Sequence, residues 1–198
     1  RRRHTRYPLV TGVQTCALPI SLKIGYRCYL AVEGGFHLSD GGYSASTHLK
    51  AGYGGLEGRA LQKGDVLRSS EIADSSRFRG VLHWTIDPCY EETVKEVRFL
   101  AGHEWKRLNE SQQDLFVRQI FLLDKRSDRM GCRLAGDPLI ISSSEEMVSS
   151  AVSFGTIQLL PDGSPIVLMA DHQTTGGYPR IGHVIHADLS KMAQAKPG

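Results

Sequence analysis

Residues 155–182 constrain the fold more than any other part of this chain. Two apolar runs are separated there by Pro161-Asp162-Gly163, which is strong turn chemistry. The second run, residues 166–170, is continuously apolar, as expected for a strand covered on both faces. These patterns predict a buried β-hairpin. Polar and glycine-containing residues, 171–178, follow it, so hydrogen-bonding groups are expected at the rim of a core, where sites usually form.

Strand pairing across this hairpin predicts that three polar side chains share one face. A four-residue loop, residues 161–164, sets Gln158 opposite Val167, and side chains alternate with a period of two. Thr156, Gln158 and Asp171 then project from the same face. Polar side chains are unfavourable to bury without partners. The functional interpretation is a polar pocket in or at the mouth of a barrel, and the structural one is a hydrogen-bond network that fixes the following loop.

The remainder of the chain predicts a mainly β protein. Short apolar or alternating runs are separated by Gly- and Pro-containing turns. A short helix is expected at 111–117, where Ser111 and Asp114 form a capping-box-like polar start, and a single helical turn at 190–194. Many short strands with few helices indicate a barrel or a sandwich. Besides the hairpin, strands are expected at residues 24–32, 94–100, 119–123, 133–134, 139–141 and 181–185.

The first twenty residues are set aside as a non-native tail. Residues 10–20, VTGVQTCALPI, look like the translation of a sequencing adapter. A basic, acid-poor start also occurs in targeting peptides, but Pro8 and Pro19 interrupt any apolar region of sufficient length. The whole chain carries a formal net charge of +3, of which the four arginines of the tail contribute +4, so the remainder carries −1. This balance gives no electrostatic reason to expect nucleic acid or a membrane surface as a partner.

Several kinds of site are not expected from the motifs. The chain has no GxxxxGK[ST] and no GxSxG, and it lacks the Met-Lys-Met that carries biotin, so no covalently attached biotin is expected. His183 and His186 would point to opposite faces of a strand, and no metal site is predicted. The three cysteines outside the tail are widely spaced, which fits reduced thiols in a cytoplasmic protein. No apolar run approaches the roughly 20 residues of a membrane helix.

Three blocks of sequence stand out. They are Gly155-Thr156-Ile157-Gln158 with Pro161-Asp162-Gly163, Ala170-Asp171 with the QTTGGYP of residues 173–179, and Ser127-Asp128-Arg129-Met130-Gly131 followed by Arg133-Leu134. Together they resemble the biotin-dependent carboxyltransferase family, which includes the C subunit of 5-oxoprolinase, the KipA-like proteins and allophanate hydrolase subunit 2. YLAVEGG at residues 29–35 and GYGGLEGRALQKGD at 52–65 extend the likeness to nearly all of residues 22–198. Each block alone is weak, and their order and spacing carry the resemblance.

The resemblance implies two linked β-barrel-like subdomains. Residues 21–80 would be the remainder of an incomplete first subdomain, and residues 81–198 a second, cyclophilin-like barrel. Both ends of the chain are expected to be truncated relative to the family, and the fragment alone is expected to be inactive.

The same resemblance implies a function shared with partner proteins. The implied reaction is ATP-dependent hydrolysis of 5-oxoproline to glutamate, and the implied partners are a KipI-like B subunit plus a LamB/YcsF-like A subunit. Two alternatives stay open: the carboxyltransferase component of a urea carboxylase or allophanate-type system, and a non-enzymatic regulatory partner of a Kip-type kinase inhibitor. ATP is the implied cofactor.

Site residues follow from the matched blocks. Asp171 or Asp128 could act as general base, and Arg129 could hold a carboxylate, a phosphate or developing negative charge. The structural alternative for Asp128 and Arg129 is a solvated charge pair in a turn. The Gly176-Gly177 pair could offer successive N–H groups to an anion, although such pairs more often permit a turn. The implied substrate-binding residues are Thr156, Gln158, Gln173, Thr174, Thr175, Gly176, Gly177 and Tyr178.

Departures from the family pattern suggest a distant branch. Gly102-His103-Glu104 replaces a common Gly-Pro-Gln, and His172 stands where arginine is frequent. Tyr43 replaces a usual glycine in the loop that contains Ser44 and Ser46. The sequence therefore does not decide whether the substrate is the one used by the better-matching members of the family.

Overall fold

The computed structural model divides the chain into two units. The first comprises Arg1–Ser21 and Tyr29–Ile86, and the second comprises Leu22–Cys28 and Asp87–Gly198. The predicted tail, residues 1–20, and the predicted subdomain boundary at residues 80 and 81 lie outside the described residues. The structure describes residues 25–27, 30, 32, 35–38, 45–69, 96–141 and 147–198.

The described part of the first unit consists mostly of turns, as its glycine content predicts. Strands β1 (Phe36–His37) and β2 (Arg68–Ser69) pair antiparallel. Arg59 donates two hydrogen bonds to the Asp65 carboxylate, at 2.7 and 2.9 Å, and thereby closes the turn that contains Gly64.

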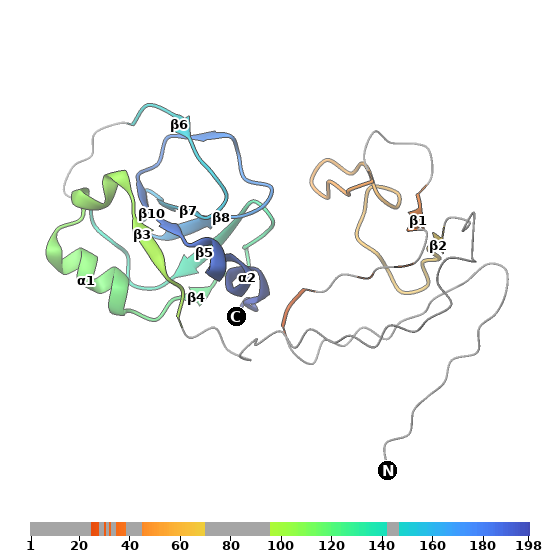
Figure 1. The fold of residues 1–198 in the computed structure, drawn as a ribbon, viewed down its shortest axis with the longest axis horizontal. Coiled ribbons are helices and arrows are strands. Elements are labelled where there is room, and N and C mark those ends of the chain that lie inside the picture. The colour runs from red at the N-terminus through yellow and green to blue at the C-terminus, as the bar shows by residue number, and fades with distance from the viewer. Residues whose placement is uncertain are drawn as a thin grey trace, which may run out of the picture. The chain divides into compact units, whose positions relative to one another are not determined.

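The second unit is built on a six-stranded antiparallel sheet, which Figure 1 shows with both helices beside it. The predicted mainly β fold is confirmed. Every strand pair in this sheet is antiparallel, which is the arrangement that hairpin turns and short strands favour. In spatial order the strands are β3 (Phe99–Ala101), β10 (Arg180–Val184), β7 (Thr156–Leu159), β8 (Pro165–Leu168), β5 (Gly131–Ala135) and β4 (Leu122–Leu123).

Smaller elements surround the sheet. A two-stranded ribbon pairs β6 (Ser150–Ala151) with β9 (Thr175–Gly176), and the 3₁₀ helix η1 spans His103–Arg107. The predicted helix at 111–117 is confirmed as α1 (Glu110–Arg118), and its N-cap is Asn109, whose side chain accepts a hydrogen bond from the backbone N–H of Gln112. Helix α2 (His186–Gln194) is longer than the single turn expected.

Several predicted strands differ from the structure. The described residues of the strand expected at 24–32, which are 25–27, 30 and 32, lie in no strand, and of the strand expected at 94–100 the described residues 96–98 lie outside β3, which begins at Phe99. Residues 139–141 do not form a strand, because Leu139 donates its N–H to the Gly163 carbonyl and Ile140 donates its N–H to the Gln112 side chain. The strand expected at 119–123 is reduced to β4, because Gln119 ends α1 and its side chain binds the backbone of Asp137.

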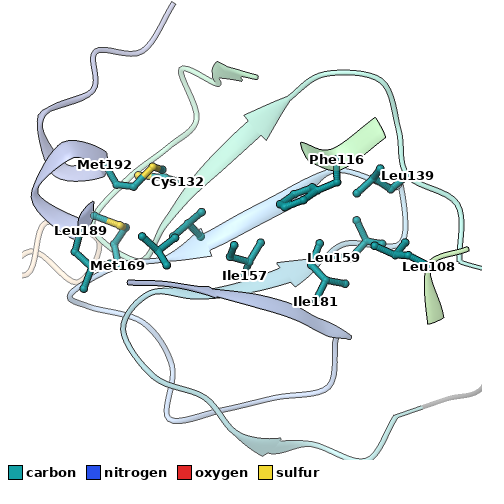
Figure 2. Packing of buried hydrophobic residues seen from close by; sticks show 12 residues of the cluster. Leu108, Phe116, Cys132, Leu139, Ile157, Leu159, Met169, Ile181, Leu189 and Met192 are labelled. Carbon is teal, nitrogen blue, oxygen red and sulfur yellow. The ribbon is translucent and has the colours of Figure 1, made fainter. Parts of the chain in front are cut away.

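The core of the second unit lies between one face of the sheet and the two helices. Figure 2 shows Phe116, Leu139, Leu159 and Leu108 at one end, and Met169, Cys132, Leu189 and Met192 at the other, with Ile157 and Ile181 between them. Phe116 also contacts the rings of Phe99, Trp105 and Phe121 at centroid distances of 5.1–5.7 Å. Since Ile157 and Leu159 face this core, the side chains of Thr156 and Gln158 must leave β7 on the opposite face.

Candidate functional site

The hairpin β7–β8 has a register one residue away from the predicted one. Gln158 pairs with Ile166 and not with Val167. Leu160 donates its N–H to the Ser164 carbonyl at 3.0 Å and therefore faces Ser164 and not Pro165, which leaves a loop of three residues, 161–163. Gly163, with φ of +80°, adopts a left-handed conformation that favours glycine. The four-residue loop assumed from the sequence was therefore wrong.

This register removes the argument that placed Asp171 on the face of Thr156 and Gln158. Thr156 and Gln158 still share a face, since they are two residues apart on β7. Asp171 lies beyond the last residue of β8, Leu168, and its side chain pairs with Arg129. The recorded hydrogen bonds thus separate the predicted site residues into small groups and do not form one network of all of them.

Gln158 is the most deeply buried of these residues, with 1% of its surface exposed. Its Oε1 accepts a hydrogen bond from Nε2 of Gln173 at 3.2 Å. A Cβ placed on Gly176 would lie 2.6 Å from Nε2 of Gln158 and 3.3 Å from Nε2 of Gln173. Gln158, Gln173 and Gly176 are therefore brought together, with β9 lying over the polar face of β7.

Thr156 is also buried, and its hydroxyl has a local role. Its Oγ1 accepts the backbone N–H of Ser153 at 3.1 Å and lies 3.3 Å from the Ser153 hydroxyl. Thr174 and Thr175 belong to the ribbon: the carbonyl of Thr174 accepts the N–H of Val152, and Thr175 pairs with Ala151. The structure uses the backbone of these two threonines to hold the ribbon together.

Arg129 and Asp171 form a bidentate ion pair at the end of β8. Nε and Nη2 of Arg129 donate to the two carboxylate oxygens at 2.6 and 2.9 Å, and the backbone N–H of Asp171 donates to the Arg129 carbonyl at 2.8 Å. The two side chains are 60% and 50% exposed. The guanidinium is thus oriented and open to solvent, which is a geometry suited to meeting an anionic group.

Asp128 shapes the turn that leads into β5. Its Oδ1 accepts the backbone N–H groups of Met130, at 2.8 Å, and Gly131, at 3.3 Å. Side-chain bonds of this kind fix an Asx-type turn. Asp128 therefore sets the backbone that presents Arg129.

The Gly176-Gly177 pair does not form an anion nest. A nest needs residues of opposite backbone handedness, and neither glycine has a positive φ. Gly176 is extended and pairs with Ser150 in the ribbon. The prediction of an anion site on these amides is corrected: glycine is suited to position 176 because the Gln158 amide lies against it.

A groove of about 820 Å³ lies beside the ribbon. Its walls are mostly apolar and include Leu139, Ile140 and Leu160, while Gly177 and Tyr178 border it from the loop after β9. Tyr178 is 44% exposed. The groove has the size of a small-molecule site, and of the predicted residues only Gly177 and Tyr178 line it.

One buried pair was not anticipated from the sequence. Glu104, on η1, is 5% exposed and binds the guanidinium of Arg180, on β10. Burial of Glu104 raises the pKa of its carboxyl, but the hydrogen bonds from the side chain and the backbone N–H of Arg180 outweigh burial and hold the pKa below its ordinary value. Glu104 and Arg180 are 76 residues apart, so no spacing in the sequence could have predicted their pairing. The one indication was that Glu104 departs from the family pattern.

We also searched the described residues for metal sites and for membrane-spanning helices. Among residues 25–27, 30, 32, 35–38, 45–69, 96–141 and 147–198, no cluster of three or more His, Cys, Asp or Glu side chains is arranged to hold a metal ion. No helix within the same ranges is both long and apolar enough to span a membrane. Cys132 is buried and unpaired by disulfide, and burial raises the pKa of its thiol.

Comparison with known proteins identifies the family. A family model described as "Carboxyltransferase domain, subdomain A and B" matches residues 18–198. The chain belongs to this carboxyltransferase domain family. The resemblance inferred from the sequence blocks is thereby confirmed.

Two curated relatives are similar over most of the chain. The C subunit of 5-oxoprolinase from Haemophilus influenzae is 43% identical over 176 residues, which cover 89% of this chain and 55% of the relative. The protein of the same name from Escherichia coli is 41% identical over 177 residues, which cover 88% of this chain and 54% of the relative. This chain therefore spans about half the length of these relatives.

A solved structure shares the fold. The crystal structure of the Kluyveromyces lactis urea carboxylase matches 89% of this chain and 17% of that protein, with a TM-score of 0.66 and 24% identity. At this identity the likeness concerns the fold alone.

Proposed function

We propose that this chain is part of the C subunit of a 5-oxoprolinase, an enzyme that hydrolyses 5-oxoproline to glutamate in an ATP-dependent reaction with partner subunits. The observation that carries the proposal is the 43% identity with a protein of that name over 89% of the chain. In the proposed reaction water adds to the ring carbonyl carbon, the ring C–N bond breaks, and the nitrogen takes up a proton.

The Arg129–Asp171 pair supplies the charged part of the proposed site. The half-exposed guanidinium can exchange Asp171 for the carboxylate of 5-oxoproline, because both are carboxylates that accept the same two N–H groups. In the free protein both oxygens of Asp171 accept hydrogen bonds from Arg129, so we assign Asp171 to orienting the arginine until the substrate carboxylate replaces it. We assign Asp128 to holding the turn, since it binds the backbone N–H groups of Met130 and Gly131.

The Gly176-Gly177 pair, which could have offered its N–H groups to an anion, does not have the geometry of a phosphate nest. Gly176 and Gly177 lack the backbone handedness of a nest. We therefore propose that ATP binds to the partner subunits, and that this chain handles the cyclic amide. The proposed partners are the KipI-like B subunit plus the LamB/YcsF-like A subunit, in the cytoplasm, where a buried reduced Cys132 is stable.

The test is an assay of the assembled enzyme. The full chain is co-expressed with the two partner subunits, and ATP hydrolysis is measured with and without 5-oxoproline. We expect 5-oxoproline to stimulate ATP hydrolysis and glutamate to accumulate in step with it. Co-purification without any 5-oxoproline-dependent hydrolysis would contradict the proposed function.

A carboxyltransferase reaction is the second candidate, favoured by the family description and by the fold shared with a yeast urea carboxylase. It predicts transfer of a carboxyl group from carboxybiotin to urea. The same preparation is therefore assayed for urea-dependent consumption of carboxybiotin. Activity with urea and none with 5-oxoproline would select this candidate.

A further inference from the structure

We propose that the side-chain carboxamide of Gln158 recognises a cis-amide, a group that presents N–H and C=O on the same edge, and that Gln173 takes the place of this ligand in the free protein. The inference rests on the proposed function and refines it, because 5-oxoproline is a cyclic and therefore cis amide. The inference states which ligand atoms form hydrogen bonds with Gln158. Its test measures binding and does not require turnover.

The first observation is an unpaired polar atom in a buried place. Gln158 is 1% exposed, and its Nε2 has no hydrogen-bond partner in the part of the chain that the structure describes. Buried donors are nearly always paired, since an unsatisfied one destabilises the fold. A ligand that accepts a hydrogen bond from Nε2 of Gln158 would explain why this donor has no partner in the free protein.

The second observation is that the other half of the same carboxamide is paired. Oε1 of Gln158 accepts from Nε2 of Gln173 at 3.2 Å. A concerted flip of both carboxamides would reverse this bond and leave Oε1 of Gln158 unpaired in place of Nε2. In either arrangement Gln173 satisfies one side of Gln158 and leaves the other open.

A cis-amide satisfies both sides at once. A carboxamide carries a donor and an acceptor side by side, so it can form two parallel hydrogen bonds with a partner that offers N–H and C=O on one edge. A lactam ring forces this arrangement, and urea has it as well. An open-chain secondary amide is trans and presents the two groups on opposite edges, so it can form only one of the two bonds.

The surroundings of Gln158 allow such an exchange. Gln173 is only half-buried and follows the end of β8, so its side chain can turn towards solvent. A Cβ at Gly176 would lie within 2.6 Å of Nε2 of Gln158 and 3.3 Å of Nε2 of Gln173. A side chain at this position would collide with the Gln158 carboxamide, so glycine lets the ribbon lie against it without displacing it.

The test is a direct binding measurement on the full chain by calorimetry and NMR. The probes are 5-oxoproline, 2-pyrrolidone and urea, which have the cis-amide edge, and N-methyl-2-pyrrolidone and N-methylacetamide, which do not. We expect saturable binding of the first three, about tenfold weaker or undetectable binding of the last two, and a shift of the Gln158 side-chain NH₂ resonance on binding. The separate responses to 5-oxoproline and urea distinguish a lactam ligand from a ureido one.

Two variants separate recognition from structure. Gln158→Leu should bind the cis-amides about tenfold more weakly or not at all, while Gln173→Ala should bind them more tightly because it removes the internal competitor. Gln62→Ala, which changes an exposed glutamine of the first unit, is the control and should leave binding unchanged. If Gln158→Leu does not fold, Gln173→Ala and the NH₂ resonance decide the matter.

The inference is overturned if the wild-type chain binds none of the cis-amides, if folded Gln158→Leu binds them as well as wild type, or if N-methyl-2-pyrrolidone binds as tightly as 2-pyrrolidone. Each of these results is compatible with 5-oxoproline-dependent ATP hydrolysis by the assembled enzyme. Conversely, cis-amide binding without such hydrolysis would retain the inference and reject the proposed function.

Discussion

Glu104, which is buried, and Arg180, which is partly buried, form an ion pair that joins three elements of the second unit. The Glu104 carboxylate accepts from Nε and Nη2 of Arg180 at 3.2 and 3.0 Å, and from the Arg180 backbone N–H at 3.0 Å. Nη1 of the same guanidinium lies 3.5 Å from the carbonyl oxygen of Ala151, on β6. The pair therefore ties η1 and β10 to the ribbon that lies over Gln158.

Removing one member of this pair should destabilise the second unit. Glu104→Leu leaves the partly buried guanidinium of Arg180 without its counter-charge, and such losses amount to about 3 kcal/mol. We expect a decrease of this size in the free energy of unfolding, measured by urea denaturation. Asp114→Ala, which breaks an exposed pair with Arg118 on α1, is the matched control and should change the free energy by less than about 1 kcal/mol. Equal effects of the two substitutions would contradict the importance given to burial.

The same pair predicts how stability depends on pH. The pKa of Glu104 is lowered in the folded state from an ordinary value of 4.5, although burial alone would raise it, because Arg180 donates to the carboxylate. A lowered folded pKa means that the stabilisation is complete above the unfolded value and is lost as pH falls below about 4.5. Wild type should therefore lose more stability than Glu104→Gln between pH 6 and pH 3, as measured by urea denaturation. A difference between the two proteins that stays constant with pH would contradict this account.

Local patterns in the sequence were sufficient for much of the fold. The turn at Pro161-Asp162-Gly163 and the apolar run after it predicted the hairpin β7–β8, and the polar start of α1 predicted that helix. The register was missed because it depends on a single bond, from the N–H of Leu160 to the Ser164 carbonyl, which shortens the enclosed loop by one residue. Apolar residues 139–141 resemble a strand in sequence, but their backbone N–H groups bind distant partners.

The candidate site was only partly accessible to the same reasoning. Family blocks selected Gln158, Gln173 and Gly176, which the structure brings together, and Arg129 with Asp171, which it pairs. Alternation in a strand says which side chains share a face, but it does not extend past the strand end, where Asp171 lies. Pairings across long stretches of chain arise from tertiary packing and have no periodic signature.

Gln158 should be dispensable for stability if its role is recognition. Gln158→Leu replaces a buried amide that has an unpaired Nε2 by an apolar side chain of similar size, so the unsatisfied donor disappears together with the single bond from Gln173. We expect the free energy of unfolding to stay within about 1 kcal/mol of wild type or to rise. Ile157→Ala, on the same strand but facing the core, is the comparison and should lose roughly 2–5 kcal/mol. A loss of similar size in Gln158→Leu would assign Gln158 to the structural network instead.

Arg129 should matter for turnover and hardly at all for folding. Its pair with Asp171 is half-exposed, and exposed pairs contribute about 0–1 kcal/mol to stability. In the assembled enzyme we expect Arg129→Ala to raise the KM for 5-oxoproline about tenfold or more, and Arg129→Lys to restore only part of the loss, because lysine cannot grip a carboxylate with two fixed N–H groups.

A matched control for Arg129 lies in the same loop. Arg126 donates to both carboxylate oxygens of Asp124 through a guanidinium that is also exposed, so Arg126→Ala removes a similar charge and a similar pair. It should leave the KM for 5-oxoproline near the wild-type value, because the proposed site assigns no substrate contact to it. If KM rose equally in both variants, the positive charge of the loop as a whole would be responsible for substrate binding. A specific contact between Arg129 and the substrate carboxylate predicts a rise in the Arg129 variant alone. Undiminished turnover in Arg129→Ala would remove Arg129 from the site and leave Gln158 as its remaining candidate anchor.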